Sequence, residues 1–120
     1  MSSTSPASVP AHIECVQGIP VVAVSGRLDT VSAPVFEAQT ASLLGETHAR
    51  VLLDLSGLTY ISSMGLRSII RIIKHTAACG GRTGIFAVQP QILEIIEITG
   101  FDLLLDVFPD RETALNGKSS

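Results

Sequence analysis

Short apolar runs near the start of this chain are typical of paired β-strands. Residues 12–15 and 20–25 flank Gln17-Gly18, and this spacing predicts a β-hairpin. The second run is apolar almost throughout, which indicates a central strand of a sheet. Residues 26–29, Gly-Arg-Leu-Asp, interrupt the run, so we expect the chain to leave the sheet there.

Alternating strand and helix patterns follow the hairpin. Ser32 is placed to cap a helix that runs to about Leu44. Residues 51–55 form a short apolar run that predicts a buried parallel strand. A short loop is expected after this strand, and it ends in the adjacent serines Ser62 and Ser63, where the next helix begins.

The helix after the two serines carries the clearest amphipathic pattern of the sequence. One expected face is formed by apolar residues at helical spacing: Leu66, Ile69, Ile70, Ile73 and Ala77. Three later elements are expected: a strand at 83–88, a helix at 90–99 and a strand at 103–108. A short terminal helix follows, with Asp110 as its N-cap.

The predicted order of elements is ββαβαβαβα, an α/β fold in which helices pack against a mixed β-sheet. A length of 120 residues suits one domain with a single core. We expect this domain at residues 12–116, between a disordered N-terminal tail at 1–11 and a flexible C-terminal tail at 117–120.

Composition narrows the classes of function. The net charge is −3 and Lys and Arg form no block, so direct nucleic-acid binding is not expected. Cys15 and Cys79 lie outside metal-ligand spacings, and we expect neither a metal nor a cofactor. These isolated cysteines and the lack of a secretion signal favour a cytoplasmic protein. The apolar segment 92–108 contains four acidic residues, which excludes a membrane span.

Ser62 and Ser63 are the candidate functional residues. The first N–H groups of a helix have no internal partner, so one serine is expected to cap the helix. Two interpretations stay open: both serines serve only as caps, or Ser62 caps while Ser63 presents its hydroxyl to solvent. In the second case the helix dipole would favour a phosphate on Ser63 by about 0.3–1 kcal/mol. Met64 beside them serves either as a partner contact or in core packing.

Two further residues near the serines call for an explanation. Gly65 weakens the first turn of the helix by about 0.5–1 kcal/mol, which indicates a close approach by another backbone or by a partner. Asp54 lies at the end of a predicted parallel strand. It could act as a phosphoacceptor or as a base, but the preferred interpretation is that it organises the loop that follows. His75 lies three turns from Ser63, too far for a nucleophile–base pair, so we do not expect an enzyme.

The segment from Asp54 to Leu66, DLSGLTYISSMGL, resembles the signature of STAS domains, and most of all that of bacterial anti-sigma factor antagonists. The resemblance covers nearly the whole chain, since residues 26–29 and the later segment 99–104 also match the family pattern. It implies the STAS fold and places the phosphorylated serine of the family at Ser63, with Ser62 as second choice. Ser62 stands where sporulation-type members usually have aspartate, so the unmodified site is less negative.

The resemblance further implies a non-enzymatic regulator that acts by partner switching. The unphosphorylated antagonist binds an anti-sigma factor that is also an ATP-dependent serine kinase, phosphorylation of Ser63 releases it, and a serine phosphatase resets it. The partner-binding residues implied in this way are Asp29, Ser62, Met64, Gly65, Leu66 and Arg67.

Two alternatives remain open. The first is a STAS subunit with a structural role in a larger assembly, such as a stressosome or a lipid-transport complex, whose serine is not modified. The second is a receiver phosphorylated on Asp54, which the lack of an acidic pair after the first strand disfavours. Phosphate chemistry separates them, because a phosphoserine is stable in acid and an acyl phosphate is labile.

Overall fold

The computed structural model describes residues 10–117. Its elements are β1 (Ala11–Val16), β2 (Ile19–Leu28), α1 (Ala33–Leu44), β3 (Arg50–Ile61), α2 (Ser63–Ala78), β4 (Arg82–Phe86), α3 (Pro90–Ile98), the 3-10 helix η2 (Phe101–Leu104), β5 (Leu105–Phe108) and α4 (Arg111–Asn116). The predicted order ββαβαβαβα is confirmed. Of the two expected tails, residues 1–9 and 118–120 lie outside the described residues.

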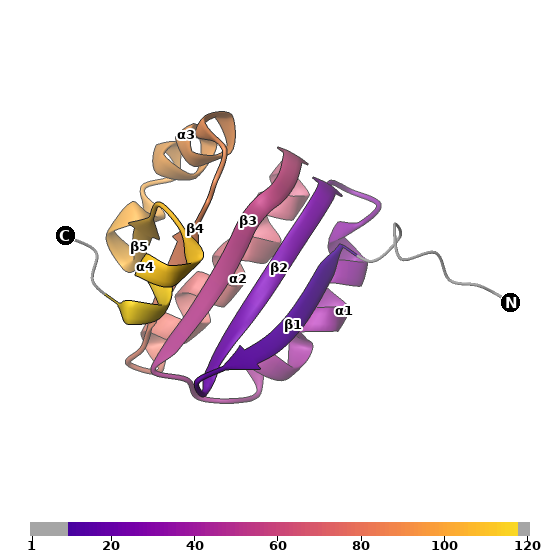
Figure 1. Ribbon diagram of the computed structural model, residues 1–120. Helices are drawn as coiled ribbons and strands as arrows, with labels where there is room; N and C mark the ends of the chain where they lie inside the picture. The colour runs from indigo at the N-terminus through magenta and orange to yellow at the C-terminus, as the bar shows by residue number, and fades with distance from the viewer. Residues whose placement is uncertain (1–9, 118–120) are drawn as a thin grey trace, which may run out of the picture.

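The five strands form one mixed sheet in the order β1-β2-β3-β4-β5 (Figure 1). β1 and β2 are antiparallel, and each later pair of neighbours is parallel. The predicted hairpin is present, and its two turn residues, Gln17 and Gly18, both have positive φ, as a tight hairpin turn requires.

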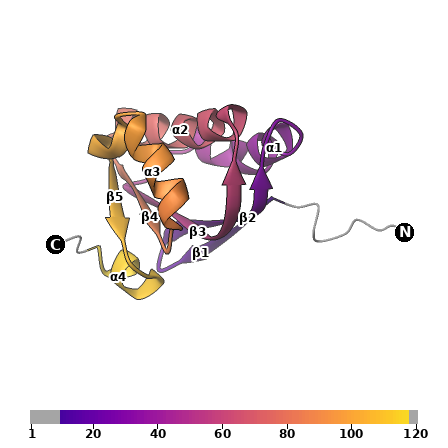
Figure 2. The ribbon, with the colours of Figure 1, turned by 90° about the horizontal axis from the view of Figure 1, so that it is seen from above.

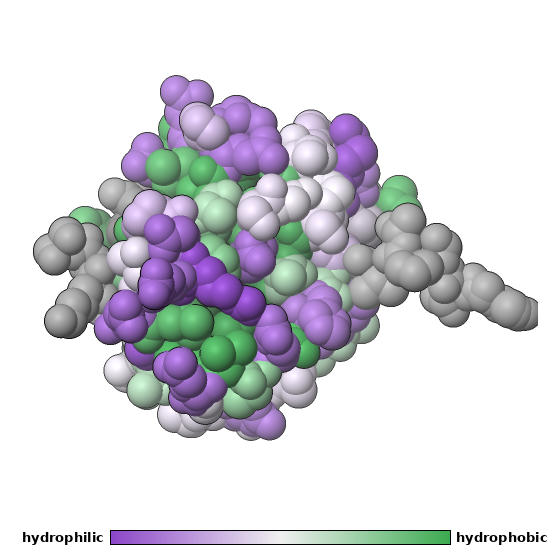
Figure 3. All heavy atoms as spheres, viewed as in Figure 1, coloured by the Kyte–Doolittle hydropathy of each residue, from purple (hydrophilic) through white to green (hydrophobic). Residues whose placement is uncertain are grey.

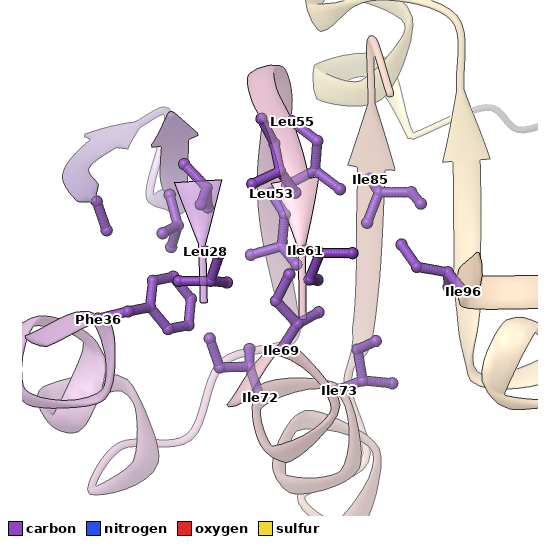
Figure 4. Close-up of a cluster of buried hydrophobic side chains, with 14 of the residues drawn as sticks. Leu28, Phe36, Leu53, Leu55, Ile61, Ile69, Ile72, Ile73, Ile85 and Ile96 are labelled. Carbon is purple, nitrogen blue, oxygen red and sulfur yellow. The ribbon is translucent and has the colours of Figure 1, made fainter. Parts of the chain in front are cut away.

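Three helices cover one face of the sheet and one helix covers the other. Figure 2 shows α1, α2 and α3 on one side and α4 on the opposite side. The larger core lies under the three helices, where Phe36 of α1 and Ile69 of α2 face strand residues such as Leu53 (Figure 4). The smaller core lies under α4 and includes Phe86 and Phe108.

β2 and β3 are both longer than the sequence suggests. The expected departure from the sheet at residues 26–29 and the expected loop after residue 55 are wrong, because β2 continues to Leu28 and β3 to Ile61. The two strands pair with each other beyond the ends of β1 and β4, through register shifts near Ser25 and Arg27. Their mutual hydrogen bonds and the burial of Leu28 and Ile61 compensate for glycines that disfavour a strand.

The buried face of α2 is rotated from the expected one. Ile69 and Ile73 are buried as predicted, but Ile72, Ser68 and Thr76 are buried beside them. The other expected members of the face are only half-buried: Leu66, Ile70 and Ala77. The two hydroxyls tolerate burial because each donates to the backbone carbonyl four residues earlier.

The sheet face on the α4 side is only partly covered. Figure 3 shows hydrophilic side chains across this face together with a group of hydrophobic ones in its lower part. Arg111 of α4 pairs with Glu14 of β1, and Arg50 of β3 donates to the carbonyls of Ala114 and Leu115 at the end of α4. These contacts fix α4 across the sheet. Within residues 10–117 no helix has the length and apolar character needed to cross a membrane.

Candidate functional site at the start of α2

The carboxyl ends of β2 and β3 and the starts of α1 and α2 meet at one edge of the sheet (Figure 1). In parallel sheets this edge commonly holds the functional site. The Ser62 N–H donates to the Leu28 carbonyl at 2.9 Å, which joins the start of α2 to the end of β2. Ser62 and Ser63 therefore sit on a rigid junction of two strands and a helix.

Ser62 is the N-cap of α2. Its backbone is extended, with φ −93° and ψ 174°, and its Oγ accepts a hydrogen bond from the Gly65 N–H at 3.2 Å. The capping role predicted for Ser62 is thereby confirmed. Ser62 is half-buried, and its hydroxyl is engaged in the fold.

Ser63 is the first residue of α2 and is exposed. Within the described part of the chain its hydroxyl makes no hydrogen bond. The side-chain cap of α2 comes from Ser62. The first turn of α2 contains no acidic residue. The arrangement offers a free hydroxyl at the positive end of a helix dipole that no acidic residue of the first turn compensates.

Gly65 faces inward, away from solvent. A Cβ at this position would lie 2.3 Å from the Leu28 carbonyl oxygen, far closer than any side chain allows. Of the two causes expected for Gly65, the close approach of another backbone is the one observed. Gly65 is buried under β2, so it offers no exposed surface for the expected contact with a partner.

Asp29 shapes the connection from β2 to α1. Its Oδ1 accepts hydrogen bonds from the N–H groups of Val31 and Ser32, each at 3.1 Å. The backbone hydrogen bond from Ser32 is the main cause that holds the pKa of Asp29 below its usual value, and the nearby Arg27 guanidinium acts in the same direction. The Ser32 hydroxyl accepts from the Asp29 N–H and does not cap α1.

Asp54 is engaged within its own strand. Its Oδ1 accepts from the backbone N–H and the hydroxyl of Ser56, at 3.0 and 2.7 Å. The preferred interpretation of Asp54, as an organiser of the backbone that follows it, is confirmed, although that backbone is strand and not loop.

Several exposed apolar side chains lie at this edge, and the exposure of Val31, Val35 and Tyr60 was not expected from the sequence. Val31 is 84% exposed and Val35 44% exposed, and both line an open cavity of about 340 Å³ beside β2. Met64 is 40% exposed, which argues against the core-packing interpretation, and its contact with a partner stays a prediction. Tyr60 is 41% exposed, with the Arg27 guanidinium 4.1 Å from the centre of its ring. Val31 belongs to no periodic stripe, so only the fold could reveal its exposure.

The remaining expected site residues lie along the first turns of α2. Arg67 is exposed and Leu66 is half-buried. A polar link that the sequence did not suggest joins α2 to α1 nearby: Glu37 of α1 accepts from the buried Ser68 hydroxyl and from Arg71 at 3.0 Å. This link fixes the position of α1 relative to the start of α2.

Comparison with known proteins gives the chain a family. Residues 11–114 match the family model described as the STAS domain. The chain belongs to the STAS domain family. The resemblance read from residues 54–66 is therefore confirmed, and it extends to the anti-sigma factor antagonists among STAS domains.

Relatives in sequence and structure support this assignment. The protein named "Putative anti-sigma factor antagonist BtrV", from Bordetella bronchiseptica, is 31% identical over 99 residues, which is 82% of this chain and 85% of the relative. An anti-sigma factor antagonist from Mycobacterium paratuberculosis has a similar crystal structure, with a TM-score of 0.80, 27% identity, and 96% and 97% of the two chains covered.

A more distant neighbour shares the fold. The phosphorylated form of the Bacillus cell fate determinant SpoIIAA matches with a TM-score of 0.71 and 14% identity, over 90% of this chain and 99% of its own. At this identity the likeness establishes the fold alone. The predicted STAS-type α/β fold is thus confirmed by sequence and by structure.

Proposed function

We propose that this protein is an anti-sigma factor antagonist that acts by partner switching on Ser63. In its unphosphorylated form it binds an anti-sigma factor that is also an ATP-dependent serine kinase. Phosphorylation of Ser63 releases it, and a serine phosphatase restores the binding form. The names of its relatives support this role, and the existence of a phosphorylated SpoIIAA structure supports the chemistry. Exchange with an ATP-consuming kinase would take place in the cytoplasm.

The proposal rests on the different environments of the Ser62 and Ser63 hydroxyls. Ser62 caps α2 through its hydroxyl, and the exposed Ser63 hydroxyl contributes nothing to the cap. A kinase can therefore modify Ser63 without removing a hydrogen bond on which the helix depends. The same modification of Ser62 would destroy the cap.

The electrostatics of the helix start explain why the phosphate would act on the partner and not on the fold. A phosphate carries about −1.5 to −2 charges near neutral pH. At the N-terminus of α2, where the first turn lacks acidic residues, this charge is favoured within the chain. A partner that covers Ser63 would have to remove the same charge from water, which opposes binding.

The proposed contact surface lies around Ser63. Met64 and Val35 supply exposed apolar area, and Arg67 supplies charge. Asp29 contributes by holding the β2–α1 turn that presents Val31. Within this surface the chain acts as a binding partner, and the chemistry of phosphate transfer belongs to the kinase and the phosphatase.

The modified residue can be identified directly by mass spectrometry. Protein isolated from its native cell is expected to carry an acid-stable phosphate on Ser63, and the variant Ser63→Ala should carry none. The matched control Ser62→Ala keeps the acceptor and should still be phosphorylated. An acid-labile phosphate on Asp54 would support a receiver instead. A chain that is never modified would support the alternative of a structural STAS subunit in a stressosome or lipid-transport complex.

The consequence of the modification is tested by measuring stability and binding on the same samples. Ser63→Asp should leave the melting temperature within a few degrees of wild type and weaken binding to the kinase by about tenfold or more. Ser42→Asp, an exposed serine at the far end of α1, is the control that adds the same charge away from the surface. Full binding by Ser63→Asp, or equal weakening in both variants, would contradict the proposal.

A further inference from the structure

Arg67 lies one helical turn beyond Ser63 on α2. We propose that Arg67 is the intramolecular receptor of the phosphate on Ser63, and that the phosphorylated chain closes a phosphate–guanidinium ion pair between these two side chains. This inference rests on the proposed phosphorylation of Ser63 and adds what the phosphate contacts once it is attached.

The spacing brings the two side chains together. Residues four apart on a helix lie on the same face with their Cβ atoms about 5–6 Å apart. Ser63 and Arg67 are in this relation, and both are exposed. The anion would stand on the N-terminal side and the cation on the C-terminal side, which is the more favourable order for such a pair. A guanidinium can donate two parallel hydrogen bonds to phosphate oxygens.

The other arginines near this edge already have partners. Arg71 donates to Glu37 at 3.0 Å, in the link between α1 and α2. Arg27 lies over the Tyr60 ring. Arg67 has neither a hydrogen bond nor an ion pair to any residue between 10 and 117. Its guanidinium can therefore turn to a phosphate without breaking an existing interaction.

The backbone at the start of α2 can satisfy only part of a phosphate. The Ser62 N–H is donated to the Leu28 carbonyl, and the Gly65 N–H is donated to the Ser62 hydroxyl. Two of the N–H groups that would otherwise serve an anion at a helix start are thus occupied. A phosphate on Ser63 has three strong acceptor oxygens, so beside the remaining backbone groups it keeps acceptor capacity for a side-chain donor.

The ion pair gives phosphorylation of Ser63 a second effect on the surface with which this chain would contact its partner. Before phosphorylation Arg67 is exposed and available to an acidic group of a partner. After phosphorylation its charge would be neutralised within the chain. One modification would then add a negative charge at Ser63 and remove a positive contact at Arg67, so the binding and released forms differ by more than the phosphate itself.

The experiment uses the full chain with phosphoserine placed at position 63 by an expanded genetic code, followed by a ³¹P NMR titration. The second pKa of a free phosphoserine is about 6, and a neighbouring cation lowers it. We expect Arg67→Gln to raise this pKa by about 0.3 unit or more, and Arg67→Lys to give an intermediate value because it keeps the charge and loses the paired hydrogen bonds. The difference should shrink at about 0.5 M salt, which screens an exposed pair.

Lys74→Gln is the matched control. It removes one exposed positive charge from the same helix, about 16 Å from Ser63 along the helix axis, and it should leave the phosphate pKa unchanged. A phosphate pKa that is equal in wild type and Arg67→Gln, or that shifts equally in both glutamine variants, would overturn the inference. Because the phosphoserine is installed directly, this result does not depend on any kinase. Failure of the proposed function would appear in the mapping of the native phosphorylation site instead.

Discussion

The helices α2 and α4 begin with the same device and use it differently. Ser62 caps α2 by accepting from the Gly65 N–H at 3.2 Å, and Asp110 caps α4 by accepting from the Thr113 N–H at 2.8 Å. α4 has a charged cap and an acidic residue, Glu112, in its first turn. α2 has a neutral cap and no acidic residue in its first turn. Acidic residues already compensate the helix dipole at the N-terminus of α4, whereas the N-terminus of α2 can still accept a negative charge.

The difference separates a structural helix start from one suited to regulation. Arg111, the first residue of α4, pairs with Glu14 and ties this helix to the sheet. Ser63, the first residue of α2, has a free hydroxyl and is exposed. The cap makes the helix stable in both cases, and only in α2 does the next residue remain available for modification.

Gly65→Ala should have the largest effect, because it breaks the junction that α2 has and α4 lacks. The added Cβ would stand 2.3 Å from the Leu28 carbonyl oxygen, so the backbone must shift. We expect a loss of about 1–3 kcal/mol in the free energy of unfolding, measured by urea titration. In the control Gly45→Ala the new Cβ would meet only the Ser42 carbonyl at 3.8 Å, and the change should stay within about 0.5 kcal/mol.

Ser62→Ala should have the second-largest effect, a loss of about 1 kcal/mol in the free energy of unfolding, because the cap is missing. The Gly65 N–H would lose its side-chain acceptor, while the neighbouring hydroxyl of Ser63 remains. Thermal unfolding of Ser62→Ala and Ser63→Ala in parallel measures the contrast, since Ser63→Ala should be nearly neutral. Equal destabilisation by both variants would mean that the two serines share the cap.

Ser63→Asp should change stability less, and in the favourable direction. A carboxylate at the start of α2 gains about 0.3–1 kcal/mol from the helix dipole at low salt. Ser42→Asp places the same charge in the last turn of α1, where the dipole opposes it, and should be slightly destabilising. A comparison of urea midpoints at low and high salt checks the sign of both effects. A destabilised Ser63→Asp would show that the start of α2 is not open to negative charge.

Acidification should produce the smallest change, and of the two caps only the charged one, Asp110, should respond. The hydrogen bond from the Thr113 backbone N–H holds the pKa of Asp110 below its usual value. The unfolded chain therefore binds a proton more readily than the folded one, so this stabilisation is complete above a pH of about 3.9 and is lost as pH falls through the lower folded value. The stability difference between wild type and Asp110→Asn should shrink over that range. The cost of Ser62→Ala should stay constant, because a serine does not titrate there.

The sequence alone determined the local features of this protein. The turn at Gln17-Gly18 and the caps at Ser62 and Asp110 depend on a few neighbouring residues. The order of elements and the STAS resemblance follow from patterns of similarly short range. Such features were predictable because backbone geometry and capping are decided within one turn of the chain.

The tertiary structure decided what depends on distant partners. β2 and β3 continue past their glycines because each supplies the other with hydrogen bonds. Ser68 is buried because Glu37, 31 residues earlier, accepts its hydroxyl, and Gly65 is required because the Leu28 carbonyl approaches it. The exposure of Val31 likewise follows from the turn that leads into α1. Pairing and close packing between remote segments leave no periodic trace in the sequence, so only the folded chain could reveal them.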